Sequence, residues 1–196
     1  MKRLLDLSVS CFLLVALSPL ILVLAALVKF GDRGPIFYSQ ERIGWRGRTF
    51  RIWKFRSMRL DSDKMGLSIT KSGDSRITVI GKLLRTTKLD ELPQLINVFM
   101  GEMSMVGPRP EVAKYVSMYT PDQRKVLELK PGITDVASIE FRNEEQLLAS
   151  VTDAEAFYVS HCIPKKIELN LRYAATATVF SDVVILGKTF FAILAH

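Results

Sequence analysis

The N-terminal part of the chain carries a long run of uncharged positions. Leu7 to Val28, 22 residues, contain no charged side chain. As one helix this run would extend about 33 Å, enough for a hydrocarbon core of about 30 Å. Pro19 interrupts the run, and because proline lacks an N–H and crowds the carbonyl four residues back, a helix bends or breaks there. The pattern predicts a membrane helix kinked at Ser18 and Pro19, where the Ser18 hydroxyl can satisfy a freed carbonyl.

Three interpretations of this run compete. A secretory signal peptide fits the basic start, Lys2 and Arg3, but not the length of the run, the internal proline or the lack of a small-residue cleavage site. A single crossing helix fits the length. Basic residues also follow the run, at Lys29 and Arg33, and basic flanks prefer the cytoplasmic side. A re-entrant helix that enters, bends and returns satisfies both flanks, and the residues alone support it as well as the straight span.

The remainder, residues 31–196, has the patterning of a small globular domain. Gly31–Pro35 is a cluster of helix breakers and marks the boundary. Ile36–Gln40 and Thr49–Phe55 alternate and are rich in aromatic and β-branched residues, which predicts a β-hairpin. Ser62–Ser75 is polar and predicts a loop. Helical patterns follow at 89–100, 121–129, 144–150, 153–160, 164–173 and 179–194.

These elements predict a helix-dominated α+β protein in two parts: a membrane helix over 1–30 and a globular domain over 31–196. Val179–Leu194 is apolar and broken mainly by Ser181, Asp182 and Lys188. It suits a core helix or an amphipathic helix lying at the membrane interface. It is equally suited to pairing with a second copy, so a homodimer stays open.

Composition and charge narrow the function classes. Of 196 residues, two are cysteines and two are histidines, so a disulfide framework and a zinc site are disfavoured. No glycine-rich nucleotide loop of the usual kinds is present. The formal net charge is +7, and Lys29–Arg59 alone holds nine basic against two acidic residues. This concentration favours an anionic partner, such as lipid head groups, phosphorylated substrates or nucleic acid.

The sequence Leu89-Asp-Glu-Leu-Pro-Gln94 is the first candidate for chemistry. Pro93 is tolerated only in the first turn of a helix, so the pattern predicts Asp90 at or near the N-cap and Glu91 in the first turn. Ordinary helix capping explains such a pair as well. Alternatively, two carboxylates at the positive end of a helix stay ionised and bind a divalent cation or act as a nucleophile.

Candidate phosphate-binding residues surround this dyad in the sequence. Gly107-Pro-Arg-Pro110 restricts the backbone of Arg109 on both sides, and a pre-set guanidinium suits bidentate contact with phosphate. In Trp53–Met58 a strand pattern sends Lys54 and Arg56 to one face. Arg85, five residues before Asp90, is a further candidate. Each of these also fits a solvated charged surface.

The order of these motifs resembles one known family. A Ser-Pro break in an apolar helix is followed by KFRSM at 54–58, LDELPQL at 89–95, VGPRP at 106–110 and PGIT at 131–134. This order resembles the bacterial sugar transferases, monotopic phosphoglycosyl transferases, from about residue 2 to Thr134. Many members continue with Gly-Trp and a Gly-Arg-Asn element, whereas this chain has Asp135-Val136 and Phe141-Arg142-Asn143, which leaves the sugar preference open.

The resemblance implies an activity and a place in the cell. Such enzymes move a sugar 1-phosphate from a UDP-sugar to a polyprenyl phosphate such as undecaprenyl phosphate, release UMP and require Mg²⁺. They are monotopic proteins of the bacterial inner membrane, in contact with phospholipid, with the catalytic domain on the cytoplasmic face. The helix of this family folds back at a Ser-Pro break, so the resemblance favours the re-entrant interpretation.

The resemblance also implies roles for the candidate residues. Asp90 would be the nucleophile of a covalent phosphosugar intermediate, and Glu91 would help to hold the metal or handle a proton, so both are expected Mg²⁺ ligands. The expected phosphate-binding residues are Lys54, Arg56, Arg85, Arg109 and Arg142.

Two rival functions are not enzymatic. A membrane-anchored scaffold with a basic surface for acidic partners predicts no Mg²⁺ dependence and no effect of substituting Asp90. A nucleic-acid binder is supported only by the basic block with its interleaved aromatic side chains, and we expect no nucleic-acid partner.

Overall fold

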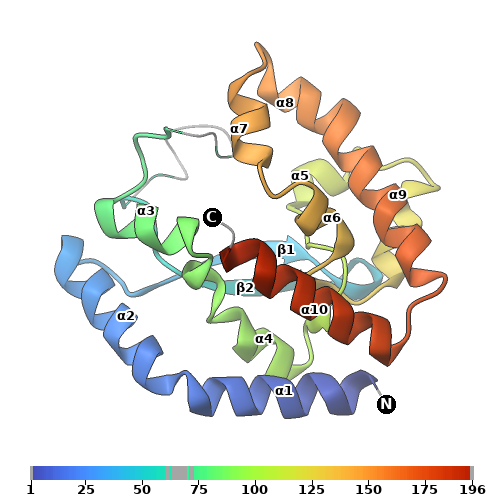
Figure 1. The fold of residues 1–196 in the computed structure, drawn as a ribbon. Helices are drawn as coiled ribbons and strands as arrows, with labels where there is room; N and C mark the ends of the chain where they lie inside the picture. Colours follow the sequence, from blue (N-terminus) through green and yellow to red (C-terminus); the bar gives the residue numbers. More distant parts are fainter. Residues whose placement is uncertain (1, 61, 63–69, 71–72, 195–196) are drawn as a thin grey trace.

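The computed structural model describes residues 2–60, 62, 70 and 73–194, and it is a helix-dominated α+β fold with two small two-stranded sheets (Figure 1). This confirms the predicted fold class. Most of the predicted loop at 62–75 lies outside the described residues.

The N-terminal segment forms two helices, α1 (Lys2–Ala16) and α2 (Ser18–Asp32). The break falls where the sequence predicts it. Pro19 cannot donate to the carbonyl of Val15, and the Ser18 hydroxyl donates to that carbonyl instead, at 2.8 Å. Among the described residues no helix alone has the length and apolar composition of a membrane span. The pair Lys2–Ala16 and Ser18–Gly31 has them together, bent by 63°.

The predicted hairpin is present. β1 (Phe37–Ile43) pairs antiparallel with β2 (Thr49–Phe55), with Phe37 opposite Phe55 and Ile43 opposite Thr49. The first strand runs three residues further than expected because its pairing continues to the short 3-10 turn η1 (Trp45–Gly47). Since side chains alternate, every second residue of the two strands faces the same side.

The segment around Asp90 corrects one expectation. A helix α3 (Val79–Thr86) ends before a separate 3-10 turn η3 (Leu89–Glu91), and α4 (Gln94–Met100) begins only after Pro93. Asp90 is therefore not an N-cap of α4, and its side chain makes no capping hydrogen bond. Pro93 has no N–H to continue a ladder and instead occupies the N-cap position itself. Gly101 ends α4 in the left-handed conformation at φ 89°.

A second sheet holds the Pro-Arg-Pro segment. β3 (Ser104–Val106) pairs in parallel with β4 (Gly132–Thr134), and residues 107–110 continue from β3 without helix. Gly107 and Gly132 touch backbone to backbone: a Cβ on Gly107 would lie 2.2 Å from the Lys130 carbonyl oxygen, and one on Gly132 2.1 Å from the nitrogen of Gly107. Only glycine permits this approach.

The C-terminal half is helical. The predicted helix at 121–129 is a 3-10 helix, and the helix expected at 153–160 continues through a π-helical turn. One hydrophobic core lies among these elements and is centred on Tyr115, Tyr158 and Ile167. The elements are α5 (Ala113–Val116), η4 (Gln123–Glu128), α6 (Val136–Glu140), α7 (Glu144–Ala149), α8 (Ala154–Phe157), η5 (Tyr158–Cys162), α9 (Ile163–Ala174) and α10 (Val179–Leu194).

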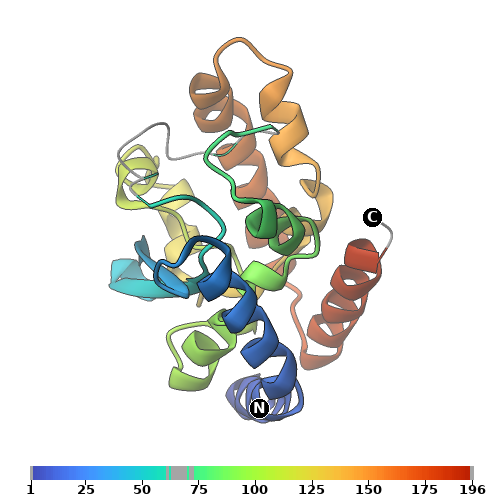
Figure 2. The ribbon, with the colours of Figure 1, turned by 90° about the vertical axis from the view of Figure 1, so that its left-hand side faces the viewer.

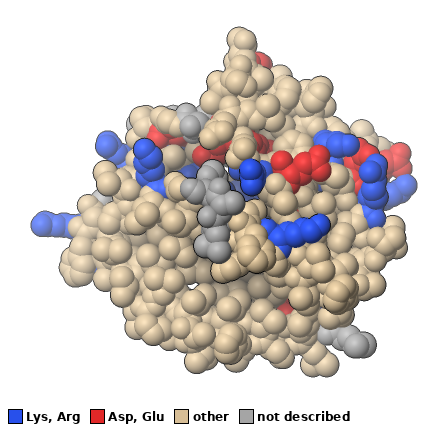
Figure 3. All heavy atoms as spheres, viewed as in Figure 1, with Lys and Arg blue, Asp and Glu red and all other residues tan. Residues whose placement is uncertain are grey.

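The arrangement separates an apolar end from a charged middle. α1 lies at one end of the molecule and α7 and α8 lie at the other, which both ribbon views show (Figures 1 and 2). Charged side chains form a band across the middle of one face, and the part of that face below the band, where α1 lies, is almost free of them (Figure 3). Large apolar side chains are exposed on α1, α2 and α10, among them Phe12, Leu22, Phe30, Phe180 and Phe191.

Candidate active site

A cavity of about 370 Å³ opens between the hairpin, the η3 turn, the Pro-Arg-Pro segment and the start of α7. Four of the nine basic residues of 29–59 line this cavity, and the other five are exposed. Its charged lining residues are Arg42, Lys54, Arg56, Arg59, Arg76, Arg85, Asp90, Arg109, Glu111, Glu144, Glu145 and Lys166.

Asp90 is a buried carboxylate at the wall of this cavity. Its exposure is 4%, and its Oδ1 atom is buried with no hydrogen-bond partner among the described residues. Burial raises the pKa of Asp90 above its usual value, and the charge of Glu91 raises it further, while Lys54 and Arg85 partly offset both. One of the two interpretations of the sequence is a pair of ionised carboxylates stabilised by a helix end. In the structure Asp90 has lost most of its solvation, and its ionised form is correspondingly less stable.

Glu91 is held by two cations. Lys54 Nζ donates to Glu91 Oε1 at 2.8 Å, and Arg109 binds both carboxylate oxygens, with Nη1 3.2 Å from Oε2. Burial alone raises the pKa of Glu91, but the attraction of Arg109 and Lys54 outweighs it and holds this pKa well below its usual range. The two adjacent carboxylates therefore differ: Glu91 is a fixed anion, and Asp90 is the one with an unengaged oxygen.

The cations around the dyad come from distant parts of the chain. Lys54 extends from β2, and burial lowers its pKa although Glu91 opposes this. Arg85, at the end of α3, lines the cavity and pairs with Glu145 of α7. Arg56 follows β2 and packs against Gly34, where a Cβ would lie 2.0 Å from its Nη1. As the strand pattern predicts, Lys54 and Arg56 line the same cavity.

Arg109 owes its place to the second sheet and to α1. Asp6 of α1 is 3% exposed and accepts hydrogen bonds from Ser104 Oγ at 3.0 Å and from the N–H of Met105 at 2.9 Å. Lys2 Nζ donates to the Val106 carbonyl at 2.9 Å. These bonds fix β3, the strand that leads into Arg109. Helix α1 therefore supports the candidate site from the apolar end of the molecule.

The residues of the site fit a divalent cation whose coordination shell is completed by oxygen atoms of the substrate. Among the described residues there is no cluster of three or more histidine, cysteine or acidic side chains able to enclose a metal. Mg²⁺ is commonly held by one or two carboxylates together with substrate phosphates, so a complete protein cage is not required. The unengaged Oδ1 of Asp90 suits that role. Both oxygens of Glu91 already face cationic donors, which makes Asp90 the better placed of the two predicted ligands.

Comparison with known proteins decides the family. The family model described as "Bacterial sugar transferase" matches residues 1–196. This chain belongs to the bacterial sugar transferase family.

Relatives of this bacterial sugar transferase are named for sugar-phosphate transfer and polysaccharide production. The UDP-glucose:undecaprenyl-phosphate glucose-1-phosphate transferase of Klebsiella pneumoniae is 37% identical over 97% of this chain and 39% of its own length. The exopolysaccharide production protein ExoY of Sinorhizobium fredii is 36% identical over 96% of this chain and 83% of its own length. A UDP-N-acetylgalactosamine-undecaprenyl-phosphate N-acetylgalactosaminephosphotransferase of Aeromonas hydrophila is 34% identical over 98% of this chain and 43% of its own length. The chain thus spans about two fifths of the first and third relatives and most of the second.

In this bacterial sugar transferase the fold brings together six of the seven predicted site residues. Lys54, Arg56, Arg85, Asp90 and Arg109 line the cavity, and Glu91 bonds to two of them. Arg142 is the exception. It is exposed in the turn between α6 and α7 and does not line the cavity. Its phosphate-binding role finds no support in the geometry.

Sequence patterns missed several cavity residues of this family member. Arg42 lies on the same face of the hairpin as Tyr38, four residues before it in β1, and Tyr38 is the partner of Lys54 in β2. Strand alternation therefore contained a usable signal for Arg42. Glu111 accepts a hydrogen bond from the Tyr158 hydroxyl, and Lys166 pairs with Glu144. No spacing links these positions, because they meet only when α7 and α9 pack beside the hairpin.

Proposed function

We propose that this chain transfers a sugar 1-phosphate from a UDP-sugar to a polyprenyl phosphate such as undecaprenyl phosphate, and releases UMP. The observation that carries the proposal is the buried Asp90 carboxylate with one unengaged oxygen, set in a cavity lined by Lys54, Arg85 and Arg109. An anionic diphosphate needs cations around it, and a nucleophile needs a free electron pair. The relatives named for UDP-sugar:undecaprenyl-phosphate chemistry supply the substrate class.

The proposed reaction has two displacements at one phosphorus atom. Asp90 attacks the sugar-bearing phosphorus of the UDP-sugar, the bond to the bridging oxygen breaks, and UMP leaves with the electron pair. An oxygen of the polyprenyl phosphate then attacks the aspartyl phosphosugar, which yields the polyprenyl diphosphate sugar and restores the carboxylate. Both steps bring anions together, so fixed cations stabilise the transition state, and this is often the largest catalytic contribution.

The chain's own residues divide this work. Arg109, held in place by Glu91, and Lys54 face the phosphates as preorganised donors. Desolvation of Asp90 raises the basicity of the attacking oxygen. We propose Mg²⁺ as the cofactor, held by Asp90 with Glu91 beside it; when bound it neutralises charge on the phosphate oxygens.

We propose that α1 and α2 form a re-entrant segment in the bacterial inner membrane, with the rest of the domain on the cytoplasmic face. A helix of 15 residues is about 22 Å long, shorter than a hydrocarbon core of about 30 Å. The N-terminal end is tied to the globular part, because Arg3 donates to the Val98 carbonyl and to the Phe99 carbonyl at 2.8 Å. In this proposal both ends of the α1–α2 pair therefore lie on the same side of the membrane. Exposed apolar residues of α10 would meet the lipid surface beside them.

The test is a donor screen with the purified chain in lipid nanodiscs. UDP-glucose, UDP-galactose and UDP-N-acetylgalactosamine are each supplied with undecaprenyl phosphate and Mg²⁺, and UMP release and lipid product are measured. We expect turnover with at least one donor, none after removal of Mg²⁺ by EDTA, and recovery when Mg²⁺ is returned. The alternative, a non-enzymatic scaffold, predicts no UMP with any donor.

A further inference from the structure

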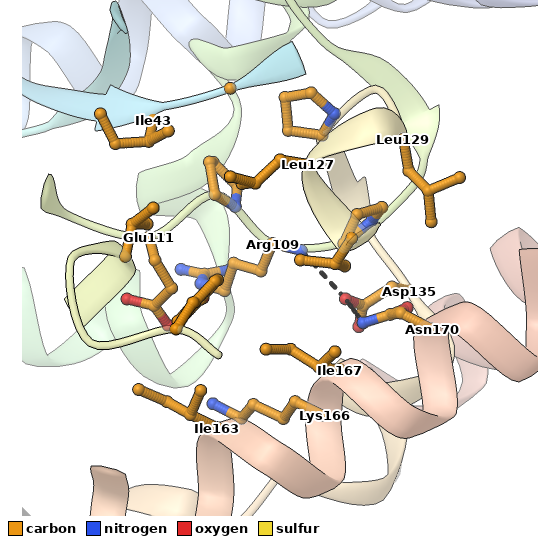
Figure 4. Close-up of a pocket in the computed structure, with 17 residues that line it drawn as sticks. Ile43, Arg109, Glu111, Leu127, Leu129, Asp135, Ile163, Lys166, Ile167 and Asn170 are labelled. Carbon is orange, nitrogen blue, oxygen red and sulfur yellow. Dashed lines mark hydrogen bonds between the residues drawn. The ribbon is translucent and has the colours of Figure 1, made fainter. Parts of the chain in front are cut away.

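A small pocket lies beside the Pro-Arg-Pro segment and is lined by Pro108, Arg109 and Pro110 (Figure 4). It is about 40 Å³ in volume, too small for a substrate, and lies between residues 108–111, η4 and the inner face of α9. Its walls are mostly apolar, and the Asp135 carboxylate faces it beside Asn170. A buried carboxylate in such a place is costly unless hydrogen bonds satisfy it.

Three donors surround Asp135, which is 2% exposed. The N–H of Arg109 donates to Oδ2 at 3.0 Å, and Asn170 Nδ2 donates to the same oxygen at 2.9 Å. The N–H of Ser138 donates to Oδ1, which makes Asp135 also the N-cap of α6. An ionised carboxylate is the one side-chain group of this size that accepts at both oxygens without offering a donor.

The bond to Arg109 is the unusual one of the three. Because Pro108 and Pro110 have no N–H, the N–H of Arg109 is the only backbone donor between Gly107 and Glu111. The structure uses this donor on Asp135. The flanking carbonyls are held as well: Pro108 accepts from the N–H of Gly132 at 3.0 Å, and Pro110 accepts from Arg42 Nη1 at 3.2 Å. The Asp135 charge also contributes to raising the pKa of Arg109, after the larger contribution of Glu91.

We propose that Asp135 is a positioning residue for Arg109, with Asn170 as its support. Parallel pairing brings the ends of β3 and β4 to one edge, so that Asp135 directly follows β4 and meets Arg109 just beyond β3. Glu91 holds the guanidinium end of Arg109 and Asp135 holds its backbone end. Two fixed points aim the guanidinium at the cavity. This inference rests on the proposed sugar-phosphate transfer, in which Arg109 faces the phosphates.

The test uses Asp135→Asn with Asp153→Asn as its matched control. Asparagine keeps the shape, but its NH₂ group must face at least one of the three donors. Asp153 is also a helix N-cap, accepting from the N–H of Ala156 at 3.0 Å, but it is exposed and does not line the cavity. Asn170→Ala is a milder second variant that leaves the bonds to Arg109 and Ser138 in place, in case Asp135→Asn does not fold.

Two readouts separate positioning from general stability. By hydrogen–deuterium exchange, we expect the peptide containing Arg109 to exchange faster in Asp135→Asn and Asn170→Ala, but not in Asp153→Asn. By steady-state kinetics, we expect Asp135→Asn to lower kcat/KM about 10–100-fold in the wild-type background. In an Arg109→Ala background we expect less than about a 3-fold effect, because the residue to be positioned is gone.

Either of two results would overturn the inference: unchanged exchange at Arg109 in Asp135→Asn, or the same loss of kcat/KM with and without the Arg109 side chain. Failure of the proposed function is distinguishable, since it appears as absent transfer by the wild-type chain. In that case the exchange measurement alone decides whether Asp135 holds Arg109.

Discussion

Glu91 and Arg109 lie 18 residues apart in the sequence and form a two-point ion pair at the wall of the cavity. The pair joins the η3 turn that carries Asp90 to the loop that follows β3. Paired in this way, Arg109 keeps a fixed direction, and Glu91 keeps its charge although its side chain is only 12% exposed. The neighbouring Asp90 has an oxygen without a hydrogen-bond partner among the described residues, and we propose it as the reactive carboxylate.

Replacing Asp90 with asparagine tests the nucleophile. We expect Asp90→Asn to abolish UMP release and the trapping of labelled phosphosugar on the protein, because the amide has no free anionic oxygen. Burial raises the pKa of Asp90, so the fold disfavours its charge. The neutral variant should therefore melt at a temperature at least as high as the wild type at pH 7. Both are measured on one preparation, by mass spectrometry and thermal unfolding, and substantial remaining turnover would remove Asp90 from this role.

Arg109 and Arg142 form a matched pair of arginines. We expect Arg109→Ala to lower kcat/KM by about 10²–10³-fold, roughly 3–4 kcal/mol of transition-state stabilisation, as for loss of one preorganised donor. Arg142→Ala should stay within about 3-fold of the wild type, because Arg142 is exposed and does not line the cavity. Initial rates over a range of UDP-sugar concentrations give both values. Equal losses in the two variants would contradict the site as described.

The acid limb of the pH profile of kcat/KM tests the pKa of Asp90, and Glu91→Gln is the substitution that shifts it. Glu91 raises the pKa of Asp90, and Lys54 lowers it. Glu91→Gln removes the negative neighbour and leaves Lys54 and Arg109 without their carboxylate partner, so both effects lower the pKa of Asp90. Since attack requires ionised Asp90, we expect the acid limb of kcat/KM to move to lower pH, with a reduced plateau. Glu168→Gln serves as the control, because Glu168 pairs only with Lys165 and Arg172 among the described residues and does not line the cavity. A limb that moves to higher pH in Glu91→Gln would refute this reasoning.

We propose that two features of the N-terminal helix pair keep both of its ends on one side of the membrane. Pro19 creates the bend, and Asp6 ties α1 to Ser104 and Met105. Pro19→Ala restores the N–H that can bond Val15, but we expect an N-terminal tag to stay accessible from the cytoplasmic side because the ties remain. Combining Pro19→Ala with Asp6→Ala should move a fraction of the tags across the membrane. Protease protection of the tag in inverted vesicles measures this, and full protection with Pro19→Ala alone would show that the ties are unimportant.

Local patterns in the sequence determined the elements well. The bend at Ser18 and Pro19, the paired strand at Thr49–Phe55 and the glycine end of α4 all follow from backbone geometry and hydrogen-bonding capacity within a few residues. The order of short motifs was enough to indicate the family. The placement of Asp90 in a helix cap failed because Pro93 starts α4 later than the apolar spacing suggests.

The site itself was decided by tertiary structure. Lys54 and Glu91 are 37 residues apart, and only the packing of the hairpin against η3 and α4 brings them to 2.8 Å. The raised pKa of Asp90 depends on burial, which no local spacing encodes. Arg142, a predicted phosphate-binding residue, is exposed, and Arg42, which no motif singled out, lines the cavity. The reason is the same, because a side chain reaches a cavity by the path of its element in space. The sequence determines which ionisable side chains are available. Long-range packing determines which of these side chains are desolvated in one cavity, where they change one another's pKa values.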